Sequence, residues 1–283
     1  MILINGENQS QLAISDRGFQ YGDGLFETIE VLNSHLIFFE QHLQRLALGC
    51  EKLLIPFPDK QLLIHEATAL SQNIKRGVLK IIITRGSGGR GYRFPDVIQP
   101  TRIVSLHPFP EYSPDFQQHG IVARICQQRL GLNPTFAGLK TLNRLEQVLA
   151  RAEWNNPEIQ EGILLDLNGC VIEGTMSNLF FVKNNTLYTP LLTQTGIAGI
   201  MRDFVLQTAS AEGIQIEQGC FSLEQLCAAD EIFLTNSIIG IWPVKDLPGF
   251  KNLAGFNAHV GEITKTLQSK LAQYKQQVYQ HDN

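Results

Sequence analysis

The feature that most constrains this fold is a proline cluster between two stretches of strand-like and helix-like segments. Pro108, Pro110 and Pro114 fall in the polar run PFPEYSPDFQQ, which contains several helix breakers. A chain of 283 residues can supply a separate core on each side of such a break. The expected division is a small N-terminal domain at 1–108, an interdomain linker at 109–118 and a larger C-terminal domain at 119–283.

The segments before the linker alternate without the regular rhythm of parallel βαβ units. Apolar and β-branched runs predict strands at Met1–Ile4, Gly24–Val31, Gly77–Thr84 and Arg102–Leu106. Apolar side chains at a helical period predict helices at Phe38–Leu54 and Gln61–Gln72. This mixture favours an α/β fold of the α+β kind.

The segments after the linker continue the mixture. Strands are expected at Gly120–Gln127, Glu161–Asp166, Asn178–Val182, Thr186–Tyr188 and Asp230–Thr235. Helices are expected at Asn143–Trp154, Gly199–Gly213 and Phe256–Val278. Both expected domains therefore combine helices with sheet.

Charge and the first residues argue against several classes of protein. A formal net charge of -4 gives no electrostatic reason to expect nucleic acid as the main partner. The start MILINGENQSQLAISDRG lacks the basic residues and apolar run of a secretory signal, and no apolar run approaches the roughly 20 residues that span a bilayer. We expect a cytoplasmic protein without a membrane partner.

Cysteines and histidines show no metal-site spacing. The five cysteines are scattered singly, an odd set without CxxC pairs, and we expect them to be reduced thiols. His42, His65 and His107 fit no HExxH or related pattern, and there is no G-x-S-x-G elbow. Metal chemistry and serine hydrolysis are not expected.

Lys140 follows the turn-prone segment FAGLK and precedes TLNRLEQ, where a helix is expected to start. An amine at such a boundary can reach into a cleft. Partial desolvation would lower its pKa, so that it could form a Schiff base with an aldehyde or carry a proton. Taken alone, a lysine that faces solvent is the simpler interpretation.

Glu173 lies in VIEGTMSNLFFV, where a carboxylate interrupts two β-prone runs. A carboxylate inside a sheet needs a partner, and a protonated pyridine nitrogen would supply one while the ion pair kept the ring electron-withdrawing. A solvated strand end is the simpler alternative.

The run TGIAGIMR at Thr195–Arg202 is a glycine-punctuated loop that enters a helix. Free backbone N–H groups at a helix start can hold a phosphate, and Arg45 could add a positive charge to the same group. Plain turn chemistry is the alternative. Together, the amine of Lys140, the carboxylate of Glu173, Arg45 and this loop are the four partners that pyridoxal 5′-phosphate (PLP) requires.

The string RGSGGRGY at Arg85–Tyr92 follows a predicted strand and, with Arg93, carries three positive charges. It could be an RNA-binding patch, a hairpin tip without function, or a loop that presents arginine to a carboxylated substrate. RNA-binding RGG segments usually occur as repeats in disordered tracts, so composition favours the hairpin tip. No Lys-Ser/Thr pair follows the glycines, which excludes a Walker loop.

Six strings occur in the order seen in fold-type IV PLP enzymes, and the resemblance covers nearly the whole chain. They are SDRGFQYGDGLFET, HLQRL, GVLKIIITRGSGGRGY, GLKTLNRLEQVLARAE, IEGTMSNLFF and TGIAGIMRDF. The resemblance implies two α/β domains with PLP at their junction, in a homodimer whose partner loops help to close the site.

The resemblance also implies roles for individual residues. Lys140 matches the Schiff-base lysine, which is also the catalytic base, and Glu173 the partner of the pyridine nitrogen. The remaining matches are Arg45, Ile200, Met201, Ser237 and Ile238 at the phosphate, Thr28 in proton transfer, and Arg90, Tyr92 and Tyr21 at the substrate carboxylates.

Within that family, TRGSGGRGY and KTLNRLEQVLAR are similar to aminodeoxychorismate lyases. The similarity implies conversion of 4-amino-4-deoxychorismate to 4-aminobenzoate and pyruvate in folate biosynthesis. An aminotransferase for D-alanine or branched-chain amino acids would need the same Lys140, Glu173 and Arg45. A non-catalytic or RNA-binding protein that uses Arg85–Arg93 is a third alternative.

Overall fold

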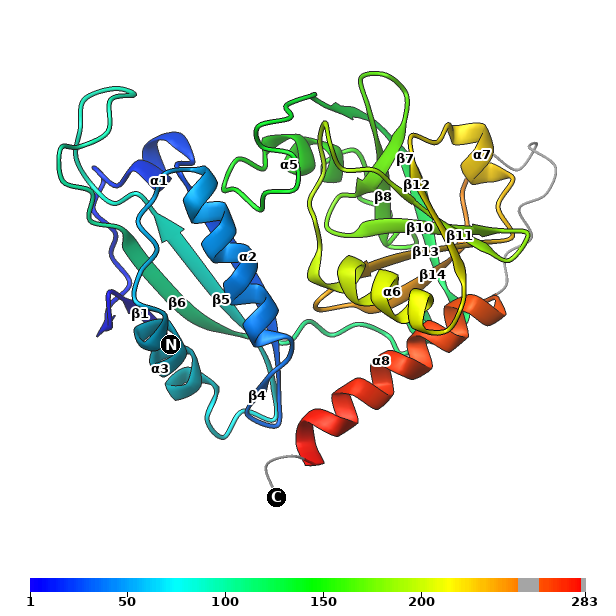
Figure 1. Ribbon diagram of the computed structural model, residues 1–283, viewed down its shortest axis with the longest axis horizontal. Coiled ribbons are helices and arrows are strands. Elements are labelled where there is room, and N and C mark those ends of the chain that lie inside the picture. Colours follow the sequence, from blue (N-terminus) through cyan, green and yellow to red (C-terminus); the bar gives the residue numbers. More distant parts are fainter. Residues whose placement is uncertain (249–259, 281–283) are drawn as a thin grey trace. The chain divides into compact units, whose positions relative to one another are not determined.

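A computed structural model describes residues 1–248 and 260–280 of the chain (Figure 1). The described residues form two compact units. The N-terminal unit contains Met1–Pro110 and Leu139–Asn143, and the C-terminal unit contains Glu111–Gly138 and the described part of Arg144–Gln277. The boundaries expected from the proline cluster stay a prediction. No sequence pattern indicated that the chain returns to the N-terminal unit at Leu139–Asn143.

A six-stranded antiparallel sheet forms the N-terminal unit, in the order β2-β1-β6-β5-β3-β4. Its strands are β1 (Ile2–Ile4), β2 (Glu7–Asn8), β3 (Gly24–Leu32), β4 (His35–Leu36), β5 (Arg76–Thr84) and β6 (Thr101–Pro108). Side chains alternate between the two faces of a strand, so the apolar run of β5 places Leu79, Ile81 and Ile83 on one face.

Helices cover that apolar face. Helix α2 (Phe39–Lys52) packs on β3, and α3 (Lys60–Ser71) packs on β5 and β6, as Figure 1 shows in blue and cyan. The short helix α1 (Arg17–Tyr21) precedes β3. The buried apolar cluster is contributed by Leu25, Ile29, Leu43, Leu46, Leu63, Leu79, Ile81, Ile83 and Leu139, among others.

The returning segment Leu139–Asn143 pairs with the start of β3. The Phe26 N–H donates to the Lys140 carbonyl at 3.0 Å, and the Leu142 N–H donates to the Gly24 carbonyl at 3.0 Å. These two bonds flank an antiparallel bridge between Leu25 and Thr141. The backbone of Lys140 is therefore fixed to the N-terminal sheet.

The C-terminal unit is built on an eight-stranded sheet in the order β12-β11-β10-β13-β14-β7-β8-β9. An additional pairing of β9 with β10 closes part of this sheet on itself, through Glu173 and Asn178. Its strands are β7 (Ile121–Leu130), β8 (Glu161–Asp166), β9 (Val171–Gly174), β10 (Asn178–Lys183), β11 (Thr186–Pro190), β12 (Gln215–Gly219), β13 (Glu231–Asn236) and β14 (Gly240–Asp246).

Five helices accompany this sheet among the described residues. They are α4 (Asp115–His119), α5 (Leu145–Arg151), α6 (Ile200–Ala211), α7 (Leu223–Cys227) and α8 (Glu262–Gln280). Helix α6, yellow in Figure 1, packs on β12 and β13. The main core brings together residues that are far apart in the sequence. Ile121 and Ile163 come from the first strands of the unit, and Leu234 and Trp242 come from the last ones.

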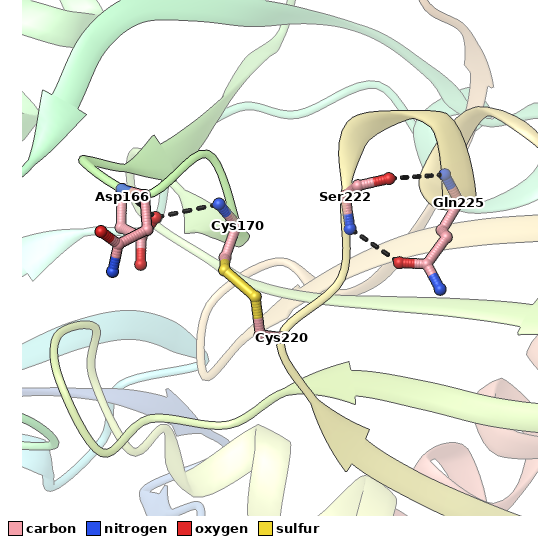
Figure 2. The surroundings of a disulfide bond; sticks show 6 residues. Asp166, Cys170, Cys220, Ser222 and Gln225 are labelled. Carbon is pink, nitrogen blue, oxygen red and sulfur yellow. Dashed lines mark hydrogen bonds between the residues drawn. A yellow bond between two sulfur atoms is a disulfide. The ribbon is translucent and has the colours of Figure 1, made fainter.

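A disulfide joins Cys170, just before β9, to Cys220, just after β12 (Figure 2). The Cys170 N–H donates to Asp166 Oδ1 at 2.9 Å, and the adjacent Val171 N–H donates to the Phe221 carbonyl at 2.9 Å. The expectation of five reduced thiols is therefore wrong for two of them. Singly spaced cysteines gave no signal for this contact, because it joins residues 50 positions apart.

Several element boundaries differ from the sequence-based expectation. Helix α5 begins at Leu145, two residues later than expected, and α4 (Asp115–His119) begins inside the stretch 109–118 that was expected to be a linker. Part of the helix expected from Phe256 falls on 256–259, outside the described residues, and α8 begins at Glu262. The two-residue strands and strand β14 were not expected at all, since short or turn-flanked runs carry weak periodicity.

Within residues 1–248 and 260–280, no helix combines the length and apolar content needed to cross a lipid bilayer.

Candidate active site

Lys140 lies in the segment paired with β3 and is half-buried. Its Nζ lies 4.4 Å from the centre of the Phe26 ring. The ring lies on β3, and the Phe26 N–H donates to the Lys140 carbonyl, so the same residue contacts both the backbone and the side chain of the lysine. The helix that follows begins five residues later, at Leu145, so Lys140 does not lie at the helix start itself.

Arg45, predicted to bind phosphate, is held by a buried carboxylate on β3. Glu27 is 1% exposed and accepts hydrogen bonds from Arg45 Nε at 2.8 Å and from His42 Nδ1 at 2.6 Å. Burial alone would raise the pKa of Glu27, but Arg45 and His42 lower it to about 2. Glu27 is thus an anion that fixes the arginine.

His42 completes this cluster on α2, three residues before Arg45. It is fully buried, and burial lowers its pKa, an effect that the Glu27 carboxylate partly offsets. The spacing of His42 and Arg45, three residues apart, predicts that they share one face of the helix, but Glu27 was not predicted as their partner. The available signal was an acidic residue on the apolar face of a predicted strand, GLFETIEV.

Thr28, predicted to assist proton transfer, is half-buried on β3 opposite Lys80 of β5. Phe26 and Thr28 share one face of the strand, since side chains two positions apart point the same way. Glu27 points to the opposite face, toward α2. Thr28 and the Lys140-contacting ring of Phe26 therefore lie on the same face of the N-terminal sheet.

Glu173 lies on β9 and is 2% exposed. Its Oε2 accepts a hydrogen bond from the Ile197 N–H at 2.8 Å, and Gln147 Nε2 lies 3.5 Å from Oε1. Burial lowers the pKa of the nearby Arg144, and the Glu173 carboxylate partly offsets that effect. The prediction that a carboxylate is set inside the sheet is consistent with this position.

The loop before α6 starts the helix without a side-chain cap at Gly199. Ile200 and Met201 occupy the first turn, where backbone N–H groups have no partner within the helix. A Cβ at Gly199 would lie 1.9 Å from Asn178 Oδ1, so a larger residue there would have to displace the Asn178 side chain. Such a helix start can accept an anion.

Ser237 and Ile238, predicted to form a second phosphate loop, lie in a turn after β13. The Ile238 and Ile239 N–H groups both donate to Asn236 Oδ1, at 2.8 and 2.9 Å. The Ile238 amide is thus engaged by Asn236, which sequence reasoning did not select. Phosphate binding by Ser237 and Ile238 stays a prediction.

The arginine-rich string divides into a buried part and an exposed part. Arg85 is 2% exposed, forms a bidentate pair with Asp23, and donates to the carbonyls of Leu53 and Leu54. Burial would raise the pKa of Asp23, but Arg85 and Arg17 hold it below its usual value. Arg85 therefore stabilises the fold and cannot present a charge to a ligand.

Arg90 and Tyr92 lie in the exposed part, with Tyr92 86% exposed. Arg17 donates from Nη1 to the Gly91 carbonyl at 2.9 Å, which holds the loop, and the Tyr92 ring lies 5.7 Å from that of Tyr21. The structure thus brings two of the three predicted substrate-binding residues together. Their contact with substrate stays a prediction.

Among the described ranges there is no group of three or more His, Cys, Asp or Glu side chains that could hold a metal ion. The N-terminal unit offers an arginine fixed by a carboxylate and a half-buried amine, and the C-terminal unit offers an uncapped helix start and a buried carboxylate. The fold is of the α+β class, and each unit by itself carries groups that suit an organic anion.

Comparison with known proteins agrees with this class. A profile of the class IV aminotransferase family matches residues 24–247. The aminodeoxychorismate lyase of Vibrio harveyi is 37% identical over 96% of this chain and 99% of its own. This chain belongs to the class IV aminotransferase family, the fold-type IV group, and the predicted α+β fold class is confirmed.

Two solved structures illustrate the range of that family. The 4-amino-4-deoxychorismate lyase of Pseudomonas aeruginosa has a TM-score of 0.90 at 42% identity, covering 96% of this chain and 98% of that one. The branched-chain amino acid aminotransferase of Escherichia coli has a TM-score of 0.84 at 27% identity, covering 96% and 93%.

Proposed function

We propose that this protein is a PLP-dependent lyase that converts 4-amino-4-deoxychorismate to 4-aminobenzoate and pyruvate, a reaction of folate biosynthesis. The observation that carries the proposal is the near full-length similarity to the Pseudomonas aeruginosa lyase, at 42% identity, against 27% for the Escherichia coli aminotransferase. In this proposal the four partners that PLP requires are Lys140, Glu173, Arg45 and the start of α6.

The donor set fits the cofactor. A phosphate dianion suits the uncapped start of α6 at Ile200 and Met201, together with the fixed guanidinium of Arg45. Glu173 is a nearly fully buried carboxylate, which suits a protonated ring nitrogen. Ser237 and Ile238 would add a second contact to the phosphate. Lys140 would supply the amine that holds the aldehyde.

PLP, when bound, supplies an aldehyde that captures amines and a ring that withdraws electrons from the bound substrate. Lys140, freed when the substrate amine takes its place, would act as the base: its Nζ would take the proton from C4 of the substrate. The adjacent enolpyruvyl C–O bond would break as the ring becomes aromatic, and the Lys140 ammonium would return a proton to the leaving enolpyruvate, which becomes pyruvate. Glu173 would keep the ring nitrogen protonated. Thr28, on the sheet face that carries Phe26, would assist the proton transfer with its hydroxyl.

Substrate orientation would come from the exposed loop of the N-terminal unit. 4-Amino-4-deoxychorismate has two carboxylates, and Arg90 offers a guanidinium for one of them. Tyr92 and Tyr21 would add hydroxyl donors. Since aromatisation of the substrate ring drives the reaction forward, the protein has mainly to orient the substrate and move protons.

We further propose that the enzyme is a cytoplasmic homodimer. Several large apolar side chains are exposed on the N-terminal unit, and a second copy of the chain would cover them. These side chains are Leu12, Ile14, Phe19, Tyr21, Tyr92, Phe94 and Val97.

The test is to incubate the purified, PLP-loaded protein with enzymatically generated 4-amino-4-deoxychorismate without any keto acid. Equimolar 4-aminobenzoate and pyruvate are expected. Amino-group transfer from D-alanine or leucine to 2-oxoglutarate, with no 4-aminobenzoate, would instead establish an aminotransferase.

A further inference from the structure

Glu161 is a buried carboxylate that the proposed mechanism does not use. It is the first residue of β8, is 1% exposed, and accepts five hydrogen bonds from uncharged donors. Burial raises its pKa, an effect that the hydrogen bonds from Thr175, Gly162, Ser177 and Met176 partly offset. Burying a carboxylate lowers the stability of a fold. A carboxylate in such a position is therefore expected to have a role that depends on its hydrogen bonds.

Four of these five bonds hold the turn between β9 and β10. Oε1 accepts from the N–H and the hydroxyl of Thr175, and Oε2 accepts from the Met176 N–H at 3.2 Å and the Ser177 hydroxyl at 2.9 Å. The turn is tight: the Gly174 N–H donates to the Ser177 carbonyl at 2.6 Å, and a Cβ at Gly174 would lie 3.0 Å from Glu161 Oε2.

The turn directly joins two residues that pair across the closing strands. Glu173 precedes it, Asn178 follows it, and these two are the single register pair between β9 and β10. Both side chains hold the main chain of the same residue: Glu173 Oε2 accepts from the Ile197 N–H at 2.8 Å, and Asn178 Nδ2 donates to the Ile197 carbonyl at 2.7 Å. The position of Ile197 therefore depends on the turn.

Ile197 belongs to the loop that leads into α6 and its proposed phosphate site. The turn also reaches the second loop, because Asn236 Nδ2 donates to the Met176 carbonyl at 2.8 Å while Asn236 Oδ1 accepts from the Ile238 amide. One short turn thus connects the proposed ring-nitrogen partner to both proposed phosphate loops.

We infer that Glu161 is a positioning residue for the cofactor site. By fixing the Gly174–Ser177 turn, it holds Glu173 in the position from which Glu173 binds the loop at Ile197. This inference rests on the proposed function of Glu173 and of the α6 start. Glu161 itself touches neither cofactor nor substrate in this account.

The test replaces Glu161 with glutamine. Whichever way the amide turns, one set of turn donors then faces an NH2 group that cannot accept a hydrogen bond. Leaving such donors unsatisfied is expected to weaken PLP binding about tenfold and to speed hydrogen exchange of the Ile197 amide about tenfold in the cofactor-free protein.

Glu231→Gln is the matched control. Glu231 also accepts from main-chain N–H groups and a threonine hydroxyl, those of Ile263 and Thr264, but it caps α8 at the opposite end of β13 from Asn236. Wild-type PLP affinity and Ile197 exchange are expected for this variant.

Either of two results would overturn the inference. In the first, the PLP affinity and the Ile197 exchange rate of Glu161→Gln are both within twofold of wild type. In the second, Glu161→Gln and Glu231→Gln change these two quantities equally. If Glu161→Gln does not fold, Ser177→Ala carries the same test, since it deletes one donor to Glu161 and predicts a smaller change in the same direction. Neither PLP affinity nor amide exchange is measured with substrate. Failure to form 4-aminobenzoate would therefore refute the proposed reaction but would leave the test of Glu161 unaffected.

Discussion

The Glu173 carboxylate and the Ile197 main-chain N–H form a hydrogen bond of 2.8 Å, three residues before the first turn of α6. This bond joins the proposed partner of the ring nitrogen to the loop that begins the proposed phosphate site. Both ends of the cofactor would therefore be held by one set of contacts within the C-terminal unit.

Glu173→Gln keeps an oxygen that can accept from Ile197 but loses the charge that would stabilise a protonated ring nitrogen. We expect kcat to fall roughly 100-fold, as when one preorganised electrostatic contact is removed from an active site. Steady-state assays at saturating PLP measure the effect, with the exposed Glu217→Gln as control. Wild-type kcat in Glu173→Gln would refute the assignment.

Glu27 gives the stability of the protein a specific pH dependence. Its pKa falls from an ordinary 4.5 to about 2 on folding, so its contribution is complete above pH 4.5 and is lost as pH falls toward 2. Because of this one carboxyl, the free energy of unfolding should be about 1.4 kcal/mol lower at pH 3.5 than at neutral pH. Urea denaturation at the two pH values should show this decrease in the free energy of unfolding in the wild type but not in Glu27→Gln. Parallel pH curves for the two proteins would contradict the assignment.

Arg85 and Arg90 lie in one loop but should differ in their effect on stability. Arg85→Ala removes one of the two arginines paired with Asp23, while Arg17 remains, and it also removes the donors to the Leu53 and Leu54 carbonyls; we expect a loss of about 3 kcal/mol in the free energy of unfolding. Arg90→Ala removes an exposed side chain and should change it by less than about 0.5 kcal/mol. Urea denaturation of both variants measures this; equal losses would show that the burial of Arg85 is misassigned.

The Cys170–Cys220 disulfide predicts a thiol count. Alkylation of the denatured, unreduced protein should label three cysteines, Cys50, Cys126 and Cys227, and reduction should raise the count to five. A disulfide that closes a loop of this length stabilises a fold by roughly 4 kcal/mol in the chain-entropy model, so Cys220→Ser should unfold at lower urea. Five labelled cysteines without reduction would refute the bond.

The sequence was informative where periodicity was long. The run GVLKIIIT and the helical period after Phe38 correspond to β5 and α2, whose apolar faces form one core. Motif chemistry also selected Lys140, Glu173 and the loop before α6 as candidates, and their roles stay a prediction. The return of Leu139–Asn143 to the N-terminal sheet escaped prediction, because two backbone bonds to β3 specify it and side-chain pattern does not.

Supporting residues were harder to find than the residues that they support. Arg45 could be selected as a cation for phosphate, but Glu27, which fixes it, looks in sequence like any strand carboxylate. Glu161 and Asn236 are similar cases: their importance lies in contacts with a turn that is 14 to 60 residues away, which no local window contains. Charge alone also misled for Arg85, whose partner Asp23 lies 62 residues earlier.

The most direct test of the proposed reaction is a product assay that compares wild-type protein with Lys140→Ala. Both proteins are loaded with PLP and given 4-amino-4-deoxychorismate without a keto acid, and 4-aminobenzoate and pyruvate are measured in the same sample. We predict equal amounts of the two products from the wild type and none above background from Lys140→Ala. Undiminished product formation by Lys140→Ala, or none by the wild type, would contradict the account.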